Sequence, residues 1–121
     1  MKKILIVDDD PHFCLVLETR LIEAGYETHV AENGQKGVSL VRTWHPDLVI
    51  MDLDMPVMDG VRAIKEIKRG GYSGKIVVMT GNPGGGNVVK AHLAGARHII
   101  AKPYQGSPVE LVESILNSTV E

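Results

Sequence analysis

The segment D-L-V-I-M-D, residues 47–52, places four consecutive apolar residues between two aspartates. A strand that is apolar on every residue is covered on both faces, which is typical of a parallel sheet lying between two layers of helices. Similar apolar runs occur at residues 4–7, 76–79 and 99–101, and a weaker one at residues 28–31. The sequence therefore predicts a largely buried parallel sheet of about five strands.

Segments of helical periodicity separate these strands. Apolar residues at three- and four-residue steps predict helices at residues 13–24, 35–42, 61–68, 88–94 and 109–116. The last begins S-P-V-E, in which Ser107 can cap the helix, Pro108 suits its first turn and Glu110 completes a capping box. Alternation of strand and helix predicts a doubly wound α/β fold, in which ligands bind at the carboxyl ends of the strands.

Length and composition limit the class of protein. With 121 residues, 44% of them hydrophobic and 23% charged, the chain is expected to form one domain over residues 1–121. The formal net charge of −2 and the lack of a basic cluster argue against direct binding of nucleic acid. The basic start M-K-K precedes an apolar run that breaks at Asp8, which is too short for a signal peptide or a membrane span. We therefore expect a cytoplasmic protein without membrane insertion, and Cys14, the single cysteine, excludes an internal disulfide.

Polar residues follow the predicted strands where each strand ends. Aspartates occupy residues 8–10 after the first strand, Asp52 follows the third, Thr80 ends the fourth and Lys102 follows the fifth. A single aspartate in such a place is usually a helix N-cap. Several carboxylates brought together raise one another's pKa unless a cation neutralises them, and a hard divalent ion with oxygen ligands does so. The sequence therefore predicts a Mg²⁺ site, or a Mn²⁺ site, at this edge of the sheet.

These residue types are suited to phosphoryl transfer. A carboxylate can attack phosphorus to form an aspartyl phosphate, while a metal and an ammonium neutralise charge and a hydroxyl donates to a phosphoryl oxygen. Asp52 is the predicted nucleophile because it ends the central, most apolar strand. Thr80 and Lys102 are the predicted hydroxyl and ammonium groups.

The remaining carboxylates are assigned to the metal. We expect Asp9 to be a direct ligand, with Asp8 in a supporting position and Asp52 as a further ligand. Asp54 is expected to offer its backbone carbonyl.

Four motifs together resemble a known family. They are I-L-I-V-D-D-D, D-L-V-I-M-D-L-D-M-P-V-M-D-G, I-V-V-M-T and A-K-P-Y, in this order over essentially the whole chain. This arrangement resembles the receiver domain of bacterial two-component response regulators. The resemblance implies a flavodoxin-like five-stranded sheet of order 2-1-3-4-5, and it gives the following roles. Asp52 is the phosphoacceptor, Asp8 and Asp9 are the acidic pair, Thr80 is the switch hydroxyl and Lys102 pairs with the phosphate.

The resemblance also implies partners and chemistry. The phosphoryl donor would be a sensor histidine kinase or a phosphotransfer protein, and the output an unknown downstream protein. The domain would catalyse its own phosphorylation and dephosphorylation and would not turn over a metabolite. The resemblance implies a cis peptide bond before Pro103 and a helix that begins at Gly60. Whether phosphorylation forms a dimer is not decided by the sequence.

Two features depart from the family pattern. Ile99 stands where receiver domains usually carry Tyr or Phe, so the aromatic half of the usual switch is missing. Three glycines, residues 84–86, follow Thr80, but Asn87 and Val88 stand where a phosphate-binding P-loop needs Lys and Ser or Thr. We therefore interpret the glycine run as a mobile loop, and hypothesise that activation reshapes this loop.

A second class of protein also fits part of the pattern. D-L-D-M at residues 52–55 resembles the nucleophile motif of haloacid-dehalogenase-like phosphohydrolases, with Asp52 again as nucleophile. That motif normally lies on the first strand of its domain, whereas Asp52 follows the third predicted strand. No acidic pair follows Lys102 except Glu110 and Glu113 within the predicted last helix, which also disfavours the hydrolase.

Overall fold

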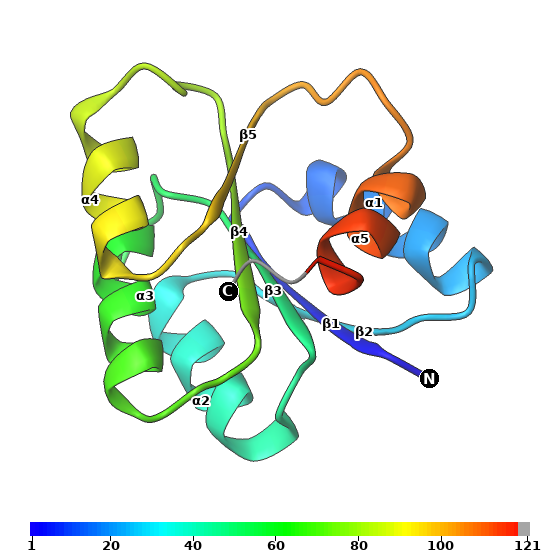
Figure 1. Ribbon diagram of the computed structural model, residues 1–121, viewed down its shortest axis with the longest axis horizontal. Coiled ribbons are helices and arrows are strands. Elements are labelled where there is room, and N and C mark those ends of the chain that lie inside the picture. The colour runs from blue at the N-terminus through cyan, green and yellow to red at the C-terminus, as the bar shows by residue number, and fades with distance from the viewer. Residues whose placement is uncertain (119–121) are drawn as a thin grey trace.

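The computed structural model describes residues 1–118, which form five strands and five helices in strict alternation (Figure 1). The strands are β1 (Lys3–Val7), β2 (Glu27–Ala31), β3 (Leu48–Met51), β4 (Lys75–Thr80) and β5 (His98–Ala101). The helices are α1 (Pro11–Glu23), α2 (Gly34–Trp44), α3 (Gly60–Arg69), α4 (Gly86–Ala94) and α5 (Pro108–Leu116). All strand pairs are parallel and the order is β2-β1-β3-β4-β5, which confirms the predicted fold.

The strand register decides which residues meet at the carboxyl edge. Val7 of β1 pairs with Met51 of β3, so the aspartates that follow these two residues leave the sheet at the same level. At the other side, Thr80 of β4 pairs with Ala101 of β5, directly before Lys102. Figure 1 shows the loops after β4 and β5 at the same end of the sheet.

Helices cover both faces of the sheet, as the fully apolar strands predicted. Figure 1 shows α1 and α5 on one side and α2, α3 and α4 on the other. Alternate strand residues point to the two sides: Leu5 and Val49 belong to the core cluster beneath α2, α3 and α4, whereas Ile4 and Ile50 belong to the cluster beneath α1 and α5. All four of these residues expose 3% of their surface or less.

Side-chain caps explain where α1 and α5 begin. The Asp10 carboxylate accepts hydrogen bonds from the backbone N–H groups of His12 and Phe13, so α1 begins at Pro11, two residues before the predicted start. Ser107 caps α5 as predicted, accepting from the Glu110 N–H at 3.3 Å. The helix after the glycine run also begins two residues earlier than predicted, at Gly86, without a side-chain cap.

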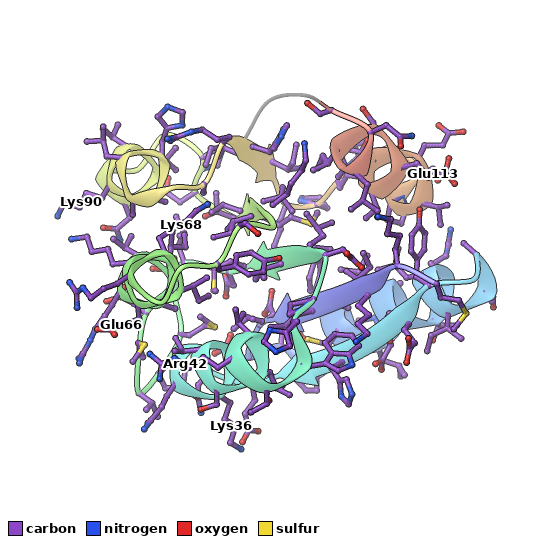
Figure 2. The ribbon with its side chains drawn as sticks, turned by 60° about the horizontal axis from the view of Figure 1, so that its bottom comes forward. Lys36, Arg42, Glu66, Lys68, Lys90 and Glu113 are labelled. Atoms are coloured by element: carbon purple, nitrogen blue, oxygen red, sulfur yellow. The ribbon has the colours of Figure 1, made fainter. Side chains whose placement is uncertain are left out.

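Charged side chains of the helices lie on the outside of the molecule. Figure 2 shows Lys36 of α2 and Lys90 of α4 at its outer surface, and Glu113 of α5 at the opposite side, whereas Lys68 lies between α3 and α4. Among the described residues, the structure contains no helix with the length and apolar character needed to cross a bilayer.

Candidate functional site

Three carboxylates meet at the carboxyl edge of the sheet. Asp8, Asp9 and Asp52 each place one carboxylate oxygen within 4.8 Å of the others. Asp8 and Asp52 expose only 3% and 9% of their surface, whereas Asp9 is exposed to solvent. Asp10 does not join them, because its side chain caps α1. The structure therefore brings together the three aspartates that the sequence assigned to the metal site and the nucleophile.

Lys102 is the cation of this cluster. Its ammonium lies 2.5 Å from Asp8 Oδ2 and 3.9 Å from Asp52 Oδ1. The second oxygen of Asp8 accepts a hydrogen bond from the Asp10 backbone N–H at 3.0 Å, so both oxygens of this buried carboxylate have partners. The peptide bond from Lys102 to Pro103 is cis, as the family resemblance implied.

The environment of Asp52 makes its carboxylate harder to ionise. Burial, and after it the charge of the neighbouring Asp8, raise its pKa to about 6, while Lys102 and the backbone N–H groups of Leu53 and Asp54 oppose this shift. The Leu53 N–H donates to Asp52 Oδ1 at 2.9 Å. A carboxyl group with a pKa of about 6 is ionised for the most part at neutral pH.

Thr80 and Asp54 line a polar pocket at this edge of the sheet. Thr80 ends β4 and is buried, exposing 1% of its surface. Its hydroxyl accepts a hydrogen bond from the Asn82 backbone N–H at 3.1 Å, which ties it to the glycine-rich loop. The side chain of Asp54 is exposed, and with Thr80, Asn82 and Lys90 it lines a polar pocket of about 180 Å³.

Gly60 fixes the loop that follows Asp52. Its N–H donates to the Leu53 carbonyl at 3.0 Å, and a Cβ at this position would lie 2.1 Å from the Asp52 backbone oxygen. Only a residue without a side chain permits this approach, so the glycine holds the loop closed beneath Asp52. The helix α3 begins at Gly60, as the resemblance implied.

Sequence reasoning missed one neighbour of the site. The ring centroid of Phe13, on α1, lies 4.1 Å from the Lys102 ammonium. Helical spacing predicted Phe13 only as an apolar residue of the core, and it does pack against the core cluster beneath α1 and α5. No motif joins the start of α1 to the residue after β5, so nothing in the sequence marked this contact.

The residues fit a divalent metal ion. Asp8, Asp9 and Asp52 contribute three negative charges and Lys102 contributes one positive charge, so this group of side chains retains two negative charges. Carboxylate oxygens clustered in this way are the donors that Mg²⁺ prefers. The acidic pocket therefore suits Mg²⁺ by charge and by donor type.

A five-stranded parallel sheet that carries an aspartate cluster, a lysine and a buried threonine at its carboxyl edge defines the receiver class of signalling domains. The sequence model of the response regulator receiver domain matches residues 4–116, and the chain belongs to this family. It is a phosphorylatable receiver domain of two-component signalling, as the sequence motifs predicted.

Individual relatives agree with this assignment. The chain is 38% identical over 115 residues to the chemotaxis protein CheY of Thermotoga maritima, covering 94% of each protein. It is 35% identical over 112 residues to the regulatory protein AtoC of Escherichia coli, covering 93% of this chain but 24% of AtoC. The chain thus spans nearly all of one relative and about a quarter of the other.

Solved structures give the same result. The CheY-like receiver domain protein of Methanospirillum hungatei superimposes with a TM-score of 0.86 at 30% identity, over 95% of this chain and 90% of that one. The receiver domain of the sensor histidine kinase PA1611 of Pseudomonas aeruginosa, described with a magnesium ion coordinated in its active site cleft, also gives a TM-score of 0.86, at 28% identity over 97% and 98% of the two chains. The phosphohydrolase alternative gains no support from these matches.

Proposed function

We propose that this domain accepts a phosphoryl group on Asp52 in a reaction that depends on Mg²⁺ and is catalysed by its own residues. The donor is a sensor histidine kinase or a phosphotransfer protein, in the cytoplasm, and the phosphorylated domain signals to a downstream protein. The observation that carries this proposal is the position of the Lys102 ammonium, which lies 3.9 Å from Asp52 Oδ1 and is held there by Asp8.

The proposed chemistry is an in-line displacement at phosphorus. A carboxylate oxygen of Asp52 attacks, the bond from phosphorus to the donor breaks, and the donor leaves with the electron pair. Lys102 neutralises charge on the phosphoryl oxygens, and the Thr80 hydroxyl donates to one of them. Attack by water on the aspartyl phosphate later releases inorganic phosphate and restores Asp52. No metabolite is turned over.

Four residues are proposed to hold the metal. Asp8, Asp9 and Asp52 supply carboxylate oxygens, and Asp54 supplies its backbone carbonyl. Bound Mg²⁺ supplies charge neutralisation at the transferred phosphoryl group.

Incubation with Mg²⁺ and acetyl phosphate tests the proposal. Intact mass spectrometry should show the addition of one phosphoryl group to the wild-type chain and none to Asp52→Asn. An adduct that survives in the variant would show that the nucleophile is misassigned. Steady release of phosphate from many small esters would favour a phosphohydrolase instead.

We further propose that the glycine-rich loop carries the signal. The hydrogen bond from the Asn82 N–H to the Thr80 hydroxyl connects this loop to the group that meets the phosphoryl oxygen. Ile99 is half-buried against the core beneath α4 and provides no ring that could rotate. Hydrogen exchange with and without a phosphoryl mimic should differ over residues 81–94, and equal protection would count against this route. Sedimentation of the same samples shows whether phosphorylation also forms a dimer.

A further inference from the structure

An aromatic face lies beside the Lys102 head group, in addition to two carboxylates. The ammonium contacts Asp8 Oδ2 at 2.5 Å, lies 3.9 Å from Asp52 Oδ1, and sits 4.1 Å from the centroid of the Phe13 ring. The side chain of Lys102 exposes 20% of its surface. A cation over an aromatic face is attracted by the electrons of the ring, and the attraction is stronger where water is partly excluded.

Open space beside Lys102 would allow its side chain to adopt another rotamer. A pocket of about 420 Å³ opens between α1 and the segment after β5, and both Phe13 and Lys102 line it. The four-carbon stem of a lysine has many rotamers, so an ammonium beside open space is held only by the contacts that favour one position. Asp8 provides one such contact, and the ring of Phe13 provides a second from a different element.

We propose that Phe13 is a positioning residue for phosphoryl transfer. Its ring face keeps the Lys102 ammonium beside Asp52, where it meets the incoming phosphoryl group. This inference rests on the proposed function of Asp52 and Lys102. Packing alone accounts for a large apolar residue at position 13, because Phe13 also contacts the core cluster beneath α1 and α5. Packing does not require an aromatic residue, however, and this difference makes the inference testable.

Three variants separate the two roles. Phe13→Leu keeps an apolar side chain and removes the ring, whereas Phe13→Tyr and Phe13→Trp keep an aromatic face. With acetyl phosphate at saturating Mg²⁺, Phe13→Leu should be phosphorylated about three- to tenfold more slowly than wild type. At least one aromatic variant should stay within about twofold of wild type. Equal rates for Phe13→Leu and wild type would overturn the inference, as would aromatic variants as slow as Phe13→Leu. Urea midpoints confirm that the compared variants are folded.

A spectroscopic signal tests the contact without any reaction. The ε-methylene protons of Lys102 should be shifted upfield by the ring current of Phe13 in wild type, and this shift should disappear in Phe13→Leu. An identical Lys102 shift in both proteins would overturn the inference. A wild type that shows the shift but takes up no phosphoryl group would instead overturn the proposed function, and with it the role of Phe13 in that reaction.

Discussion

Lys102 bridges two buried carboxylates from neighbouring strands, with its ammonium 2.5 Å from Asp8 Oδ2 and 3.9 Å from Asp52 Oδ1. One positive charge cannot neutralise both of them together with the exposed carboxylate of Asp9. The site is therefore short of positive charge without a metal. Burial and this shortage together explain the raised pKa of Asp52, and they lead to the following predictions.

Replacing Asp52 should stabilise the metal-free fold. Burial raises the pKa of Asp52 from 3.8 to about 6, so the folded state binds the proton more tightly than the unfolded state. The stabilising effect of that proton is full below about pH 4 and is lost as the pH rises through about 6. In EDTA at about pH 7.5, Asp52→Asn should therefore raise the free energy of unfolding by on the order of 1–3 kcal/mol. Urea unfolding at several pH values measures this, and a gain that does not shrink toward pH 4 would contradict the explanation.

Magnesium should stabilise the wild-type chain by mass action. At about 100 times its dissociation constant, a ligand that binds only the folded state adds about 2.7 kcal/mol. Thermal unfolding with Mg²⁺, compared with sodium chloride at the same ionic strength, should show a higher midpoint. Asp9→Asn should lose most of this gain. Asp10→Asn is the matched control, because Asp10 caps α1 and an asparagine caps equally well; an equal loss in both variants would argue against Asp9 as a ligand.

Two glycine substitutions should have opposite effects. A Cβ at Gly60 would lie 2.1 Å from the Asp52 oxygen and 2.8 Å from Leu53 Cα, and both are backbone atoms. Gly60→Ala should cost at least about 2 kcal/mol and slow phosphorylation, because the loop beneath Asp52 must shift. Gly86 begins α4, and among the described residues a Cβ added there would meet no atom of a neighbouring segment within 4 Å. Gly86→Ala should be neutral or should stabilise by up to about 1 kcal/mol. Equal changes in the urea midpoint, relative to wild type, for both variants would contradict this account of the loop.

Val57 occupies an unfavourable backbone conformation in the loop after Asp52. Its φ of 70° lies in the left-handed region, which is costly for a β-branched residue, and its side chain is 72% exposed. Val57→Asn should therefore stabilise the fold by about 0.5–1 kcal/mol. Val89, 61% exposed on α4, is the control, since Val89→Asn should change stability by less than about 0.5 kcal/mol. A loss of stability in Val57→Asn would show that the valine makes a compensating contact.

The sequence was sufficient to predict the sheet and the charged cluster at its edge. Fully apolar runs such as residues 48–51 predicted buried parallel strands, and the rule that such strands end at one edge predicted that Asp8, Asp52 and Lys102 would converge. The early start of α4 at Gly86 was not predicted, because glycines usually end helices. A glycine is tolerated in the first turn, since the N–H groups there need no partner within the helix.

Contacts between motifs that are distant in the sequence could not be predicted from it. The Phe13 ring meets Lys102 only because α1 packs beside the segment after β5. The left-handed backbone conformation of Val57 could not be predicted either, because valine is disfavoured in that conformation.

The site of phosphorylation is the most direct test of the central claim. After reaction with acetyl phosphate and Mg²⁺, hydride reduction converts an aspartyl phosphate to homoserine, which peptide mass spectrometry locates in the chain. The account predicts homoserine at position 52. Homoserine at position 8, 9 or 54, or unmodified aspartate at all four positions in a chain that has gained a phosphoryl group, would contradict it.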